Sequence, residues 1–130
     1  MDIEIRMLAW TVVLGLVQLL LAAAGMTTQR GVKWNASARD GEARPLAGVP
    51  GRLDRAWRNF LETFPFFAAA VLAVIATGRQ GETSALAVQL YFWARVLYVP
   101  VYAAGIPYLR SAVWGVSMLG IAMLLWTLLG

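Results

Sequence analysis

Four long runs of apolar residues constrain the fold of this chain more than any other feature. Residues 7–26 and 111–130 contain no charged side chain, residues 60–77 contain only Glu62, and residues 83–104 contain only Arg95. Because about 20 helical residues cross the ~30 Å hydrocarbon core of a bilayer, each run is long enough to span it. The sequence therefore predicts an all-α integral membrane protein. We expect one four-helix transmembrane domain over residues 1–130, with spans near residues 5–28, 53–77, 83–104 and 108–129.

A cleaved signal peptide is the alternative interpretation of the first run, because residues 22–24 are three alanines that resemble a cleavage site. Two features favour a membrane span instead. The leader is net acidic, with Asp2 and Glu4 against Arg6. The run of about 20 residues is also long for the apolar part of a signal peptide.

Basic residues cluster around the loop that separates the first two spans. Seven of the 11 lysines and arginines lie between residues 30 and 58, in or beside a loop expected at residues 29–52. By the positive-inside rule this loop is cytoplasmic, as is the turn at residues 105–110, and both termini lie on the non-cytoplasmic side. A short basic loop between two spans is ordinary membrane topology, so we expect no nucleic-acid partner.

The chain contains no cysteine and no histidine. This composition excludes disulfides, a protein thiolate nucleophile, histidine ligation of haem and the usual zinc sites, and we expect no metal. Any chemistry must use arginine, tyrosine, serine, asparagine and carboxylate side chains, or a reagent that the protein binds.

Polar residues form a continuous face at the start of the second span. At 100° per residue, four side chains fall within an arc of roughly 100°. These are Arg55, Arg58, Asn59 and Glu62. Such groups cost several kcal/mol each in hydrocarbon, so the face is expected to meet a polar partner. Arg52 lies at the margin of the arc, and setting the topology is its expected role.

The third span contains a stripe of tyrosines interrupted by an arginine. Tyr91, Arg95, Tyr98 and Tyr102 lie within roughly 60° of arc. Tyrosines alone indicate packing or an interfacial belt, but an intramembrane arginine needs a partner. Glu62 is the only carboxylate in the four apolar runs, so the pattern predicts an Arg95–Glu62 pair, which is compatible with a shared ligand pocket. In the first span, Gln18 either hydrogen-bonds across the bundle or lines a polar pocket.

The short connection at residues 105–107 makes the third and fourth spans antiparallel neighbours, with Arg110 and Ser111 at the start of the fourth. This position is either an anion-binding corner or a topology-setting arginine followed by a helix-capping serine. Three polar sets then meet at one membrane edge. Arginines bind carboxylates and Glu62 can hold an ammonium group, so the edge suits a small anionic zwitterion. An arginine beside a bound thiol would stabilise its thiolate.

These residues carry a family resemblance. The pattern R-x-x-R-A-x-x-N-x-x-E-x-x-P, from Arg52 to Pro65, resembles the helix-two motif of the MAPEG family, the membrane-associated proteins in eicosanoid and glutathione metabolism. The residues on the third and fourth spans resemble that family's pattern as well. The resemblance implies a homotrimer that holds glutathione between neighbouring subunits. The implied glutathione-binding residues are Arg30, Arg55, Arg58, Asn59, Glu62, Arg95, Tyr98 and Tyr102. Arg110, with Ser111, would polarise the thiol toward thiolate.

The leading hypothesis is a glutathione-dependent enzyme, of the transferase or peroxidase type, that conjugates or reduces hydrophobic electrophiles delivered from membrane lipid. A non-catalytic lipid-binding or scaffold member of the same fold is the alternative. A small multidrug transporter is a third hypothesis, but that class places an essential carboxylate in the middle of the first span, where this chain has Gln18. Tyr98 replaces a histidine of the prostaglandin synthase branch. The loop sequence WNASARD resembles bacterial members, which implies a bacterial inner membrane.

Overall fold

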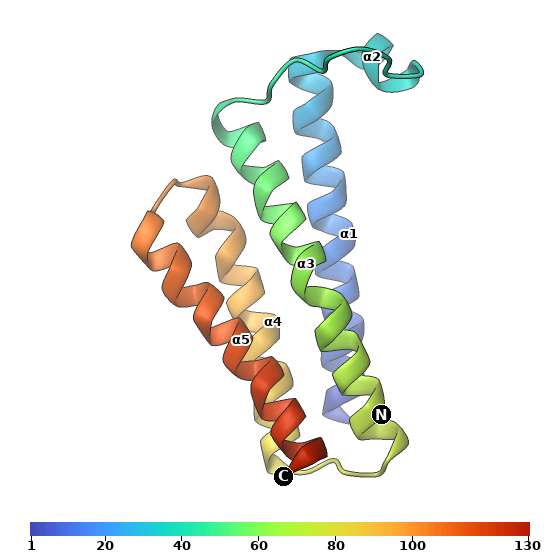
Figure 1. The fold of residues 1–130 in the computed structure, drawn as a ribbon, viewed down its shortest axis with the longest axis vertical. Helices are drawn as coiled ribbons and strands as arrows, with labels where there is room; N and C mark the ends of the chain where they lie inside the picture. The colour runs from blue at the N-terminus through green and yellow to red at the C-terminus, as the bar shows by residue number, and fades with distance from the viewer.

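The computed structural model describes all 130 residues and contains helices but no strands (Figure 1). The four long helices are α1 (Ile3–Arg30), α3 (Gly48–Ala76), α4 (Glu82–Ala103) and α5 (Pro107–Leu129), and α2 (Val32–Ala36) is a short helix after α1. Each long helix is long and apolar enough to cross a membrane. The prediction of an all-α integral membrane protein with four spans is confirmed.

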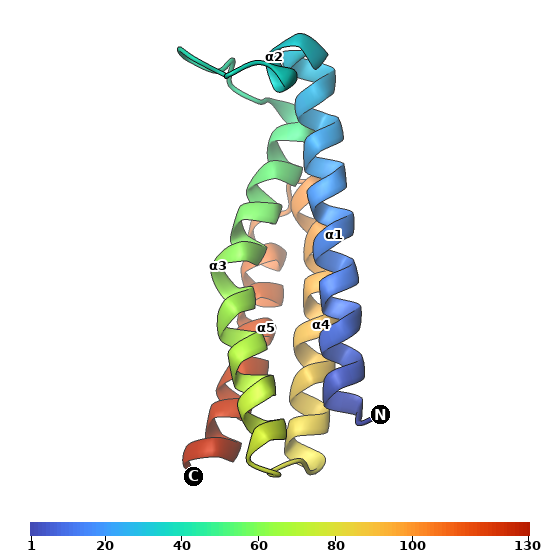
Figure 2. The ribbon, with the colours of Figure 1, turned by 90° about the vertical axis from the view of Figure 1, so that its right-hand side faces the viewer.

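The long helices alternate in direction along the chain. Both termini and the α3–α4 connection lie at one end of the bundle, whereas α2 and the α4–α5 turn lie toward the other (Figures 1 and 2). We call these the terminal end and the loop end. The pairs α4–α5 and α1–α3 pack most closely, and α3 and α4 join the two pairs. The basic loop and the α4–α5 turn therefore share one end, as the expected topology requires.

The connection between α1 and α3 contains more helix than the expected loop at residues 29–52. Helix α2 follows Gly31, whose φ of 90° breaks α1 and turns the chain. The Asn35 side chain donates from Nδ2 to Thr27 Oγ1 at 2.6 Å, which ties α2 to α1. Helix α3 begins at Gly48, ahead of the span start expected at residue 53. Pro50 lies in its first turn, where a residue without an N–H fits.

Pro65 lies inside α3, where a membrane-spanning helix tolerates a proline. The helix continues through it without interruption, and Figure 2 shows α3 bowed along its length. Because proline removes one backbone hydrogen bond, a bend near this point is expected.

The apolar core occupies the terminal half of the bundle. Phe67, Val71 and Val74 on α3 pack with Tyr91 on α4 and Leu124 on α5, and all five are fully buried. The Phe67 and Tyr91 rings stack with centroids 4.0 Å apart. Packing at this end leaves the polar residues of α3, α4 and α5 together in the loop half.

Polar contacts hold the terminal end together. The buried Glu4 carboxylate accepts a hydrogen bond from Ser84 Oγ at 3.0 Å, and Asp2 accepts one from Gln80 Nε2 at 2.9 Å. The prediction that Glu62 is the only carboxylate within a span is therefore wrong, because the long helices also include Glu4, Asp54 and Glu82. The chain before the first apolar run is helical and contacts α4, which residue charge alone does not reveal.

Helices α4 and α5 approach each other closely at Gly120. A Cβ atom at this position would lie 2.8 Å from the backbone oxygen of Ala87 and 3.1 Å from the backbone nitrogen of Tyr91. Both contacts are with backbone atoms of α4, which cannot move aside independently. Gly120 thus sets the distance between α4 and α5, the two helices that carry Tyr98 and Arg110.

We expect Gly120→Ala to destabilise the protein by about 1–3 kcal/mol, because the added methyl forces α5 away from α4. Thermal unfolding of the detergent-solubilised protein measures the effect. Gly115→Ala is the matched control on the same helix, since nothing lies within 4 Å of its added Cβ. Its unfolding temperature should stay the same or rise, because alanine favours helix over glycine. Equal behaviour of the two variants would contradict the close approach.

Candidate functional site

A polar pocket opens between α3, α4 and α5 at the loop end. Its volume is about 260 Å³ and its lining contains seven residues from the three predicted polar sets. These are Arg55, Arg58, Asn59, Glu62, Tyr98, Tyr102 and Arg110. An adjoining hollow of about 180 Å³ shares Arg55, Tyr102 and Arg110 with it. We refer to the seven residues as the polar pocket.

Arg95 lies beneath the pocket rather than in its wall. Its side chain is 1% exposed, and Nη1 donates to Asn59 Oδ1 at 3.0 Å. The guanidinium carbon also lies 4.2 Å from the centroid of the Tyr98 ring, a cation–π distance. Arg95 therefore supports two pocket residues, Asn59 from one side and Tyr98 from the other.

The predicted Arg95–Glu62 pair does not form. The only ion pair in the structure joins Arg58 and Asp54, and Glu62 is exposed. The rotation of α3 presents Asn59, one turn before Glu62, to the guanidinium group. Glu62 is instead exposed at the mouth of the polar pocket on a membrane-spanning helix, where a charged side chain is costly unless a ligand or another subunit covers it.

Tyr98 and Tyr102 position two of the pocket's arginines. Arg110 Nη1 donates to the Tyr98 hydroxyl at 3.4 Å, and the Arg110 guanidinium carbon lies 5.0 Å from the Tyr102 ring centroid. Arg55 lies 5.9 Å from the same centroid. Tyr102 therefore lies near two cations that come from different helices, and its ring offers both guanidinium groups a cation–π contact at the pocket.

Tyr91 is separate from this group although it belongs to the same tyrosine stripe. Its hydroxyl shares a hydrogen bond of 2.8 Å with Thr63 Oγ1, and its ring is part of the apolar core. The tyrosines of the stripe therefore have different surroundings. Tyr91 is a packing residue, while Tyr98 and Tyr102 line the pocket.

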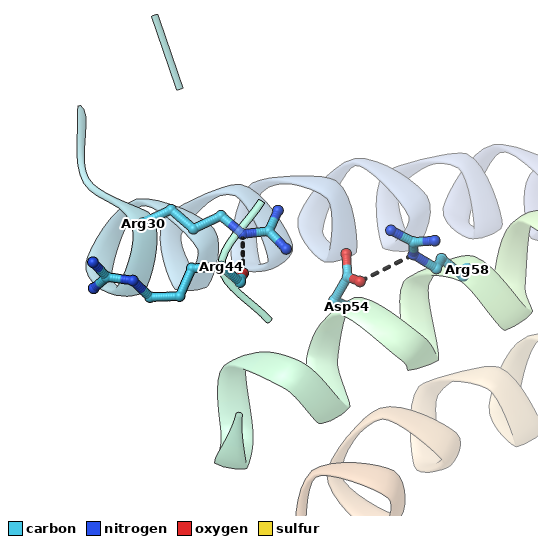
Figure 3. A network of polar contacts seen from close by, with 4 residues as sticks. All are labelled: Arg30, Arg44, Asp54 and Arg58. Carbon is cyan, nitrogen blue, oxygen red and sulfur yellow. Dashed lines mark hydrogen bonds and ion pairs between the residues drawn. The ribbon is translucent and has the colours of Figure 1, made fainter. Parts of the chain in front are cut away.

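Arg58 lines the polar pocket and forms an ion pair with Asp54. Its Nε donates to Asp54 Oδ2 at 3.0 Å across one helical turn, and its side chain is 70% exposed (Figure 3). An exposed pair of this kind contributes only about 0.3–0.5 kcal/mol. The Arg58 side chain can therefore turn toward a ligand at little cost.

Besides Arg95, two predicted residues do not line the polar pocket within one chain. Arg30 ends α1 and donates from Nε to the backbone oxygen of Arg44 at 2.7 Å, apart from the Asp54–Arg58 pair (Figure 3). Ser111 is exposed and its hydroxyl donates to the Pro107 oxygen at 3.4 Å. The alternative that Ser111 caps the helix is wrong, because α5 begins at Pro107 and its N-cap is Ile106.

Arg52 has a structural role that the sequence did not suggest. Its Nη1 donates to the backbone oxygen of Ala103 at 3.0 Å, which connects the start of α3 to the end of α4. Arg52 also lines the adjoining hollow. The one available signal was its position three residues before Arg55, which places the two side chains on neighbouring parts of the helix surface.

An apolar groove continues from the polar pocket between α3 and α5. Its volume is about 810 Å³, and it shares Asn59 and Glu62 with the polar pocket. From there it runs along Phe66 and Trp114 to Leu128 near the terminal end. A polar pocket that opens into an apolar groove can hold a polar molecule at one end beside an apolar one.

Comparison with known proteins supports the resemblance seen in the sequence. The MAPEG family profile matches residues 7–130. The chain belongs to the MAPEG family. No curated protein matched the chain in a parallel search. As a family member, this membrane-spanning protein is related to glutathione and eicosanoid metabolism.

The residues of the polar pocket fit the chemistry of glutathione. The tripeptide has two carboxylates, one ammonium group and a thiol, and the pocket offers three arginines and the Glu62 carboxylate. Guanidinium groups bind carboxylates in bidentate fashion, and a carboxylate binds ammonium. The pocket has an excess of positive charge, as a ligand with net negative charge requires.

We expect Asn59→Ala to destabilise the protein by about 1–3 kcal/mol, because it removes the only protein group that accepts a hydrogen bond from the buried Arg95 guanidinium. Asn59→Asp keeps the acceptor and should retain stability. Gln89→Ala is the control, since the exposed Gln89 amide bonds only within its own helix, to Ala85. Thermal unfolding in detergent compares the three variants. Wild-type stability in Asn59→Ala would contradict the role of this contact.

Proposed function

We propose that this protein is a glutathione-dependent membrane enzyme that conjugates or reduces hydrophobic electrophiles. The observation that carries the proposal is the convergence of three arginines and a carboxylate on one pocket that opens into an apolar groove. Family membership supports the use of glutathione. The polar pocket would hold the tripeptide, and the groove would hold the electrophile after it enters from the bilayer.

Each pocket residue has a proposed task. Arg55 and Arg58 bind the two carboxylates, Glu62 binds the ammonium group, and Asn59 binds the peptide backbone. Tyr98 and Tyr102 close the wall on α4 and hold Arg110 in place. Arg110 lies at the first turn of α5, where it would face the thiol.

Glutathione, when bound, supplies the sulfur nucleophile. The Arg110 guanidinium stabilises negative charge at that sulfur, so the thiol proton leaves to water. In a conjugation, the new bond joins the sulfur to the electrophilic carbon, and the bond from that carbon to its leaving group breaks. The protein contributes the position of the reactants and the stabilisation of charge rather than a covalent step.

We propose that the site is completed in a homotrimer. Glu62 and Arg58 are exposed on a membrane-spanning helix, and a neighbouring subunit would shield them from lipid. Arg30, which lies apart from the pocket of its own chain, would then approach the pocket of a neighbour. The basic loop would face the cytoplasm, in keeping with its charge.

A non-catalytic lipid-binding protein is the second candidate, and the size of the apolar groove favours it. A groove of about 810 Å³ is large enough for a lipid or drug-sized ligand without any reaction. The two candidates differ in the expected behaviour of a generic electrophile, which only the enzyme conjugates.

We expect Arg110→Ala to lower the turnover number for conjugation of 1-chloro-2,4-dinitrobenzene by about 10²-fold or more, because it removes the charge that stabilises the thiolate. Glutathione affinity should fall much less, since Arg55, Arg58 and Glu62 remain. Titration calorimetry of the purified protein with glutathione measures the affinity, and chloride release or product absorbance measures turnover.

Arg79→Ala is the control for this variant. Arg79 lies at the terminal end, where it donates to the backbone oxygens of Thr127 and Leu128, so its loss should not affect glutathione binding or turnover. Equal losses of affinity and turnover in Arg110→Ala, or no loss, would reject the proposed role of Arg110. Glutathione binding without any conjugation by the wild type would favour the lipid-binding candidate.

A further inference from the structure

Gln18 is a buried polar side chain that the polar pocket does not explain. It lies on α1, it is 4% exposed, and neither its Nε2 nor its Oε1 atom has a hydrogen-bond partner. The expected hydrogen bond of Gln18 across the bundle is therefore not made by direct contact with another helix. Buried amides without a protein partner typically bind an ordered water, because leaving both groups unpaired lowers stability.

Arg95 has unpaired groups of the complementary kind. Its Nε and Nη2 atoms are buried and have no partner, while Nη1 is bonded to Asn59. Guanidinium N–H groups only donate, whereas the Gln18 oxygen only accepts. A single water molecule can accept from Arg95 and donate to Gln18, so the two side chains can satisfy each other through solvent.

The register of α1 against α4 places these groups within one helical turn of each other along the bundle. Both helices run from the terminal end toward the loop end, and they pack against each other (Figure 1). The Glu4–Ser84 hydrogen bond pairs their first turns. Gln18 lies 14 residues after Glu4, and Tyr98 lies 14 residues after Ser84 (18 − 4 = 98 − 84 = 14). At 1.5 Å per residue, each helix rises by about 21 Å over this length, so Gln18 is level with Tyr98. Arg95 lies one turn before Tyr98.

The Phe60 ring on α3 gives independent support for this level. A Cβ atom on Gly15 would lie 3.0 Å from Phe60 Cε1, so α1 meets the ring one turn before Gln18. The Arg95 guanidinium carbon lies 5.8 Å from the centroid of the same ring. Gly15 and Gln18 are both buried on one face of α1. The Phe60 ring is therefore a neighbour of the Arg95 guanidinium group and lies about one helical turn from the level of Gln18.

We propose that Gln18 and Arg95 share an internal water site between α1 and α4, and that Gln18 is a positioning residue for the polar pocket. The water fixes the plane of the Arg95 guanidinium group, which in turn orients the Asn59 amide and the Tyr98 ring. Tyr98 accepts the hydrogen bond from Arg110. Gln18 thus acts on the pocket through Arg95, although it does not line it. The functional part of the inference rests on the proposed function.

A double-mutant cycle tests this coupling. We expect Gln18→Leu to lower the conjugation turnover number by about 3- to 10-fold and the unfolding temperature by several degrees, because it leaves Arg95 unpaired. In the Arg95→Lys background, which lacks the forked donors, the same change should have at most a small effect. Gln18→Glu keeps the acceptor and should retain wild-type turnover and unfolding temperature.

Thr11→Val is the matched control on the same buried face of α1. The Thr11 hydroxyl donates to the Met7 oxygen of its own helix, so its effect should add to that of Arg95→Lys without coupling. Additive effects of Gln18→Leu and Arg95→Lys would overturn the inference. Unchanged turnover together with a raised unfolding temperature in Gln18→Leu would overturn it too, because the amide would then be an isolated buried group.

The test remains informative if one variant or the proposed function fails. If Arg95→Lys does not fold, the comparison of Gln18→Leu with Gln18→Glu decides the matter, since only Gln18→Glu keeps the acceptor. If the wild type neither binds glutathione nor conjugates the electrophile, the proposed function fails. The unfolding temperatures then decide alone whether Gln18 and Arg95 are coupled.

Discussion

The buried guanidinium group of Arg95 is the interaction on which the loop half of the bundle depends. An arginine stays charged in a protein, and this one is buried without a carboxylate as its ion-pair partner. The charge is stabilised by a hydrogen bond to Asn59 and by a cation–π contact with the Tyr98 ring. The same contacts set the orientation of two pocket residues, so the interior of the bundle and the pocket wall form one unit.

The two ends of the molecule have different tasks. At the terminal end, apolar side chains from all four long helices form the core, and Gly120 brings α5 close to α4. At the loop end, α3, α4 and α5 present arginines, tyrosines and Glu62 to a pocket. The packed apolar half thus holds the helices in place, and this brings together the pocket arginines, whose like charges repel one another. The excess positive charge that remains is suited to an anionic ligand.

Helical periodicity predicted most of the candidate site and failed where the result depends on packing. The spacing of Arg55, Arg58, Asn59 and Glu62 placed them on one arc, and the structure brings all four to the polar pocket. Spacing could not show that Asn59, rather than Glu62, meets Arg95, because the rotation of α3 against α4 decides this contact. It also could not show that Arg95 lies below the pocket or that Glu4 is buried against Ser84. These are contacts between segments far apart in sequence.

The central claim is that the cations of the polar pocket hold the glutathione thiol as a thiolate. The most direct measurement is the ultraviolet difference absorbance of the thiolate when glutathione is mixed with the purified protein near neutral pH, where a free thiol is mostly protonated. We predict a thiolate signal that saturates with bound glutathione, is strongly reduced in Arg110→Ala, and is absent with S-methylglutathione. Glutathione binding that saturates with no thiolate signal would contradict the account.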